Sequence, residues 1–138
     1  MSERMPSMYP IVRYRDQRAG MEWLCEAFGF EKHEVHETPD GELVHVELRH
    51  DNGIVMVSSE GGSQEAYAGK AGEGAVYVVV EDPDAHHDRA KAAGADIVAR
   101  LSDTDYGSRD YAARDPEGNL WTFGTYRPSA DGSAGSER

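Results

Sequence analysis

The chain is long enough for one domain of average size, with 138 residues of which 38% are hydrophobic and 29% charged. Its 26 acidic and 14 basic residues give a formal net charge of −12, which argues against nucleic acid and anionic membranes as partners. The sequence has no apolar run that could cross a bilayer, no signal-peptide pattern, and one cysteine, Cys25, which excludes an intrachain disulfide. We therefore expect a cytoplasmic protein, whose acidic surface serves either solubility or the attraction of a cationic ligand.

The first of two similar pieces spans residues 8–59 and follows a polar segment, 1–7, that is predicted to be flexible. It opens with an apolar strand that ends near Asp16, a residue type suited to the N-cap of a helix. Apolar residues then recur at helical spacing up to Gly29, which predicts a helix that ends at this glycine. Three strands are predicted to follow, over residues 30–37, 42–50 and 54–59.

The second piece spans residues 75–126 and repeats this order of elements. An apolar strand ends at Asp82, and a helix follows that is predicted to stop at Gly94 and to expose His86 and His87 to solvent. Three further strands are predicted over residues 95–101, 109–114 and 119–126. The glycine-rich segments 60–74 and 127–138 contain little apolar surface, so the first is predicted to be a linker and the second a disordered tail.

Equivalent glycines in the two pieces have a constant separation. Gly29 corresponds to Gly94 and Gly53 to Gly118, and both pairs are 65 residues apart. A constant offset over a whole piece indicates an internal repeat. The sequence therefore predicts an α+β fold of two tandem βαβββ modules.

Two short motifs support a family resemblance. Ala27-Phe28-Gly29-Phe30 ends the first predicted helix, and the segment DPEGNLWTFGTY occupies residues 115–126. Together with the repeat, they resemble the vicinal oxygen chelate superfamily, in its glyoxalase/bleomycin-resistance branch. The resemblance implies that the strands form a curved mixed sheet, or cup, with the helices packed outside it.

The metal site of this superfamily is expected to be absent. The resemblance places its four ligand positions near Tyr9, within residues 54–57, at Ala75 and at Thr122. Divalent ions need several histidine, carboxylate or thiolate donors, and these positions offer only a neutral phenol and a hydroxyl. We therefore expect no metal at this position and no cofactor.

Alternation along the strands predicts which side chains face the cup. Trp121 and Phe123 are expected to pack under the helices, whereas polar and aromatic side chains on the opposite face are candidates for ligand contacts. The loop 102–110 is predicted either to close over the ligand or to be a surface excursion. The predicted ligand-binding residues are Tyr9, Arg13, His45, Glu47, Tyr77, Tyr106, Arg109 and Thr122.

The hairpin of the second and third strands carries a polar face. A four-residue loop would pair Glu34 with His45 and would place both on the same face as Glu47. This face is either a solvated part of the sheet, a patch that orients a ligand, or a displaced metal site. We expect Glu47 to offset the charge of Arg13, and Arg13, His45, Glu47 and Tyr77 to line one cavity.

These observations predict a metal-independent small-molecule-binding protein of the bleomycin-resistance type. Its ligand is expected to be a planar or cationic drug or metabolite, because tyrosines and an acidic field suit such compounds. The alternative is a lyase or isomerase of glyoxalase type with an atypical site. A homodimer is also expected, because a module on its own leaves sheet edges unpaired.

Overall fold

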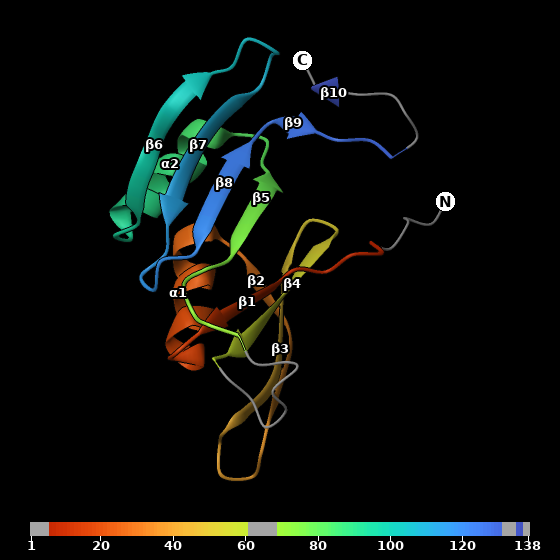
Figure 1. The fold of residues 1–138 in the computed structure, drawn as a ribbon, viewed down its shortest axis with the longest axis vertical. Helices are drawn as coiled ribbons and strands as arrows, with labels where there is room; N and C mark the ends of the chain where they lie inside the picture. The colour runs from red at the N-terminus through yellow and green to blue at the C-terminus, as the bar shows by residue number, and fades with distance from the viewer. Residues whose placement is uncertain (1–5, 61–68, 131–134, 137–138) are drawn as a thin grey trace.

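The computed structural model describes residues 6–60, 69–130 and 135–136, and it contains two βαβββ modules in tandem (Figure 1). The first consists of β1 (Ile11–Tyr14), α1 (Gln17–Phe28), β2 (Glu31–Glu37), β3 (Leu43–His50) and β4 (Gly53–Ser59). The second consists of β5 (Ala75–Val79), α2 (Pro83–Ala92), β6 (Asp96–Asp103), β7 (Arg109–Arg114) and β8 (Leu120–Gly124). The predicted α+β class and the tandem duplication are therefore confirmed.

A short antiparallel pair, β9 (Tyr126–Arg127) with β10 (Gly135–Ser136), follows the second module. Much of the predicted linker and of the predicted flexible ends lies outside the described residues, so these three predictions stay predictions. In the part of the chain that the structure describes, neither helix is long and apolar enough to span a bilayer.

Each module forms its own four-stranded mixed sheet. The strand orders are β1-β4-β3-β2 and β5-β8-β7-β6, with β1 parallel to β4 and β5 parallel to β8. α1 packs against β3 and β4, α2 packs against β6 and β7, and the two helices contact each other (Figure 1). Within one chain the two sheets are separate, so their union into one cup remains an expectation for an assembly of chains.

The helix ends follow the capping residues that the sequence predicts. The side chains of Asp16 and Asp82 accept hydrogen bonds from the amides of Ala19 and Ala85, at 3.0 and 3.1 Å. Gly29 ends α1 with a φ of 78°, a left-handed conformation that glycine adopts without a steric penalty. These local interactions fix where each helix begins and where α1 ends.

The buried side chains of both modules form one core. Val12 and Tyr14 of β1 lie in the same cluster as Phe28 of α1 and as Trp121 and Phe123 of β8. Phe28 is in ring contact with both of these β8 residues, at centroid distances of 5.6 and 4.7 Å. The predicted core positions of Trp121 and Phe123 are thereby confirmed.

A buried carboxylate, Asp115, connects the two modules. Only 4% of this residue is exposed, and its Oδ2 accepts a hydrogen bond from the Tyr14 hydroxyl of the first module at 2.5 Å. The same oxygen accepts from Trp121 Nε1 at 3.0 Å, and Oδ1 accepts from the amides of Glu117 and Asn119. Burial and the adjacent Asp115 raise the pKa of Tyr14 well above its ordinary value, so the phenol remains a donor.

A second connection between the modules corrects the prediction that His86 and His87 face the solvent, since both are partly buried. His86 is half-buried rather than solvent-facing: its Nε2 donates to the carbonyl of Phe28 at 2.9 Å, and its Nδ1 lies 2.6 Å from the Tyr111 hydroxyl. Arg89 Nε also donates, to the carbonyl of Glu26 at 2.9 Å. The last carbonyls of α1, which have no partner within the helix, are thus satisfied by side chains of α2.

We predict that Asp115→Ala lowers the free energy of unfolding by roughly 3 kcal/mol or more, because it leaves several buried donors without an acceptor. Urea denaturation at pH 7 measures this change. Asp96→Ala removes an exposed carboxylate at the start of β6 and serves as the control, with an expected change within about 0.5 kcal/mol. A loss below about 1 kcal/mol for Asp115→Ala would contradict the role given to this carboxylate.

We also predict that His86 makes the fold less stable in mild acid. Burial, together with the smaller effects of His50 and Arg89 and against the hydrogen bond to Phe28, lowers the pKa of His86 to about 4. Because the folded-state pKa lies below the ordinary value of 6.5, the unfolded chain takes up the proton first as the pH falls. The contribution is complete above pH 6.5 and is lost toward pH 4.

Between pH 7 and pH 5 we expect His86 to lower the free energy of unfolding by about 1 kcal/mol, a figure discounted for the partial exposure of the ring. Urea denaturation of the wild type and of His86→Gln at both pH values measures this effect. The variant should be less stable at pH 7 and should lose less stability on acidification. Equal losses in the two proteins would rule out the assignment.

Candidate functional site

The outer face of the first sheet carries the polar side chains that the sequence assigns to it. Val46 and Leu48 of β3 point into the core, so His45 and Glu47 point to the opposite side. The His45 Nε2 and Glu47 Oε2 atoms are 2.7 Å apart. On β2, His36 faces His45 across the strands.

The register of this hairpin differs from the prediction. Glu34 lies opposite Glu47 rather than His45, because Glu37 pairs with Leu43 across a loop one residue longer than predicted and an irregularity between His36 and Glu37 adds a second residue. The shift amounts to two residues, so each side chain stays on the predicted face of the sheet. The face assignment is therefore right, and the predicted pairing is wrong.

Arg13 and Glu47 lie on this face but do not pair. Strand β4 separates β1 from β3, so the two backbones are about 10 Å apart. Arg13 Nη1 donates to the carbonyl of Ser59 at 3.4 Å, and Glu47 contacts His45 and, at 3.9 Å, His33. Among the residues that the structure describes, no ion pair joins Arg13 to Glu47, and this expectation is corrected.

The outer face of the second sheet carries Tyr77 and Thr122, which lie opposite each other on β5 and β8. The Tyr77 hydroxyl donates to the carbonyl of Tyr126 at 2.8 Å. Tyr106 is exposed and forms an edge-to-face ring pair with Tyr126. Three of the predicted residues therefore gather on or near this face.

Two other predicted residues lie elsewhere. Arg109 points to the helix side, where it pairs with Asp84 of α2 through two hydrogen bonds and with Asp103 of β6. Tyr9 precedes β1, and its hydroxyl donates to the carbonyl of Pro6 at 2.7 Å. The structure thus divides the predicted residues between two sheets whose outer faces both point away from the shared core.

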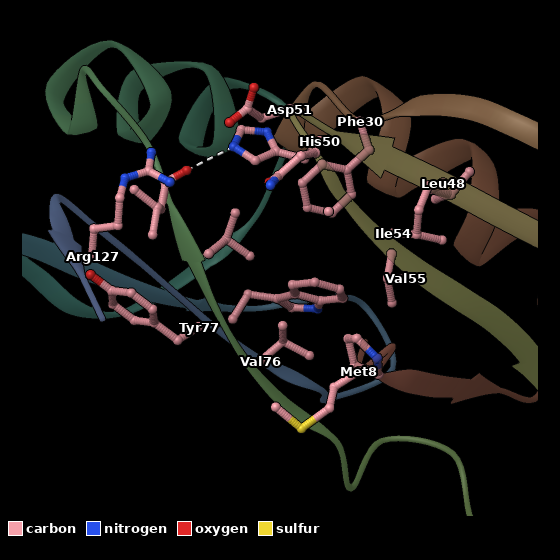
Figure 2. A pocket seen from close by; sticks show the side chains of 16 residues that line it. Met8, Phe30, Leu48, His50, Asp51, Ile54, Val55, Val76, Tyr77 and Arg127 are labelled. Carbon is pink, nitrogen blue, oxygen red and sulfur yellow. Dashed lines mark hydrogen bonds between the residues drawn. The ribbon is translucent and has the colours of Figure 1, made fainter. Parts of the chain in front are cut away.

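A cavity of about 200 Å³ lies at the junction of the modules, between β5 and the turn that joins β3 to β4 (Figure 2). Its wall is apolar and aromatic, and polar groups occur at its rim. The apolar lining includes Met8, Phe30, Leu48, Ile54, Val55, Val76 and Trp121. The polar lining includes His50, Asp51, Tyr77 and Arg127.

This cavity follows the free edge of β5. The amides of Leu120 and Val80 bond across the parallel ladder to the carbonyls of Gly74 and Gly124, so alternate main-chain groups of β5 face β8. The main-chain groups of the intervening residues, Tyr77 and Val79, consequently face the other way. His50 Nε2 donates to the Val79 carbonyl at 2.7 Å. Among the described residues, no hydrogen bond engages the main-chain groups of Tyr77 or the amide of Val79 at this edge.

Of the residues that line this cavity, the sequence analysis predicted only Tyr77 as a ligand-binding residue. Phe30 and Trp121 have the pattern of core residues, and both are in fact buried. They line a cavity because the two sheets diverge beside them, and this depends on how the modules pack. Alternation within one strand contains no information about that packing.

The described residues do not form a metal centre. Among residues 6–60 and 69–130 and the short β10, no three His, Cys, Asp or Glu side chains lie close enough to share an ion. At the superfamily's ligand positions, the Tyr9 hydroxyl bonds to a carbonyl, and Ala75 and Thr122 supply no strong donor. These side chains do not suit the metal of the related enzymes.

The fold and this site define a small-molecule-binding architecture of duplicated βαβββ modules. The chain belongs to the Glyoxalase/Bleomycin resistance protein/Dioxygenase superfamily, whose sequence profile matches residues 9–123. The family that the sequence resembles is therefore confirmed.

Comparisons with individual proteins agree with this assignment. TioX from Micromonospora sp. ML1 is 38% identical, with a TM-score of 0.75 over 85% of this chain and 95% of TioX. TnmS3, an antibiotic binding protein from Streptomyces sp. CB03234, shares the fold at 16% identity, with a TM-score of 0.66 over 83% of this chain and 90% of TnmS3. An uncharacterised protein of Mycobacterium bovis is 29% identical over 86% of this chain and 82% of its own length.

Proposed function

We propose that this protein binds a planar aromatic or cationic small molecule without a metal, and that it sequesters this compound in the cytoplasm. The observation that carries the proposal is the junction cavity, which combines an aromatic and apolar wall with a few polar groups at its rim. This is the usual make-up of a site for a small organic ligand. The antibiotic binding stated for TnmS3, which has the same fold, supports a small organic molecule as the ligand.

We further propose that two chains form the complete ligand site. Arg13, His45 and Glu47 lie on the outer face of one sheet and Tyr77 on that of the other, and these faces do not meet within a chain. β1 and β5 are both edge strands. A second copy that pairs with these edges would join two sheets into one cup and would bring the two sets of side chains together.

We predict that the protein binds acridine orange, a planar aromatic cation, or metal-free bleomycin after dialysis against EDTA. Fluorescence titration and the rise in Tm measure the binding. Ile54→Trp, which places a large ring in the junction cavity, should weaken it at least tenfold. Val98→Trp, at an exposed position on β6, should leave it unchanged.

Two results would contradict this proposal. One is that neither compound binds to the wild type. The other is that binding requires a stoichiometric divalent ion, which would favour the alternative, a lyase or isomerase of glyoxalase type. For that alternative, the pair of His45 and Glu47 is the arrangement that could supply a general base.

We predict that the protein sediments at micromolar concentration as a particle of twice its 15.2 kDa mass. Val79→Pro should yield a monomer, because it removes an amide from the free edge of β5 and leaves the bonds to β8 intact. Val79→Thr preserves this amide and should remain dimeric. A monomeric wild type would refute the two-chain site.

A further inference from the structure

A glycine on β8 allows two polar side chains to approach each other on the outer face of the second sheet. Gly124 lies between Val79 of β5 and Asp110 of β7 in the sheet. A Cβ atom at position 124 would lie 2.0 Å from Asp110 Oδ1 and 2.8 Å from the Tyr77 hydroxyl oxygen. Both groups therefore occupy the space that the Cβ atom of any other residue at position 124 would fill.

Within the part of the chain that the structure describes, the carboxylate of Asp110 has a hydroxyl donor but no cationic partner. Its Oδ1 accepts a hydrogen bond from the Ser108 hydroxyl at 2.5 Å, and Ser108 is only 1% exposed. Ser108 Oγ in turn accepts from the amide of Tyr126 at 3.0 Å. The neighbouring Arg109 is held by Asp84 and Asp103 on the helix side, and within the described residues no hydrogen bond or ion pair engages Asp110 Oδ2.

The Tyr77 hydroxyl lies near this carboxylate, and two further tyrosines adjoin Tyr77. The rings of Tyr106 and Tyr126 meet edge to face at a centroid distance of 5.8 Å, and the hydroxyl of Tyr77 bonds to the carbonyl of Tyr126. Tyr77 and Tyr106 are 38% and 58% exposed, so a ligand can reach both. Burial raises the pKa of Tyr77, and the nearby Asp110 and Tyr106 raise it further against the hydrogen bonds to it, so the phenol is neutral at pH 7.

We propose that Asp110, Tyr77 and Tyr106 form a subsite for the protonated amine of an arylalkylamine. An ammonium group can donate to Asp110 Oδ2 and to the hydroxyl oxygen of Tyr77. The electron-rich face of a tyrosine ring also attracts its positive charge. The net charge of −12 concentrates cations near the surface and acts in the same direction. This inference rests on the proposed function and adds to it the place and chemistry of the charged part of the ligand.

The test compares phenethylamine with 2-phenylethanol, which has nearly the same shape but carries no charge. Both are titrated into the isotopically labelled full chain, and the amide signals of Tyr77, Asp110 and Gly124 are followed by NMR. We expect the amine to bind at least tenfold more tightly than the alcohol and to shift these signals. Asp110→Asn should abolish this preference, because the amide still accepts from Ser108 but has no charge.

Two further variants make the result specific. Asp96→Asn removes the same charge from an exposed position at the start of β6 and should retain at least half of the preference for the amine. Gly124→Ala places a methyl group where the Asp110 carboxylate lies, so it should also abolish the preference. Circular dichroism and Tm establish that each variant is folded.

The outcomes separate this inference from the proposed function. Equal affinity of the wild type for amine and alcohol would overturn the amine subsite, even if acridine orange or bleomycin binds. An unchanged preference in folded Asp110→Asn would overturn it as well. If acridine orange and bleomycin do not bind but the preference for the amine depends on Asp110, the amine subsite is supported and the proposed sequestration of planar compounds is refuted.

Discussion

The structure depends on one buried carboxylate, that of Asp115. A negative charge removed from water is tolerated only when hydrogen bonds replace its hydration, and Asp115 accepts from Tyr14, Trp121 and two main-chain amides. Tyr14 belongs to the first module and the other donors to the second. The same interactions that satisfy the charge therefore also join β1 to the turn between β7 and β8.

This connection determines which surfaces remain available for recognition. Because Asp115, Phe28 and His86 bring the helix sides of both sheets into one core, the opposite faces of the sheets point outward. Side chains on the helix side are buried and contribute stability. Those on the outer side, such as His45 and Tyr77, contribute little to the core and can be used for binding.

Local patterns in the sequence were sufficient to predict the modules, the caps at Asp16 and Asp82, and the faces of the strands, because each depends on residues close in the chain. The pairing of Glu34 was not predictable in the same way, since a longer loop and one irregularity in the ladder together shift the register by two residues without changing the face. The junction cavity and the buried position of His86 depend on how two modules pack. Contacts such as the one between His86 and Phe28, 58 residues apart, are not encoded in any local pattern.

Only the structure indicates which acidic side chains are placed to attract a ligand. A net charge of −12 does not indicate which of the 26 carboxylates can attract a ligand. Asp115 is surrounded by donors, and Asp84 and Asp103 are engaged by Arg109. Asp110, in contrast, has one hydroxyl donor among the described residues, faces the outer side of the sheet, and lies near the exposed Tyr77. A carboxylate already oriented by the Ser108 hydroxyl needs less reorganisation to receive a cation, which is why we propose that Asp110 is the carboxylate used for recognition.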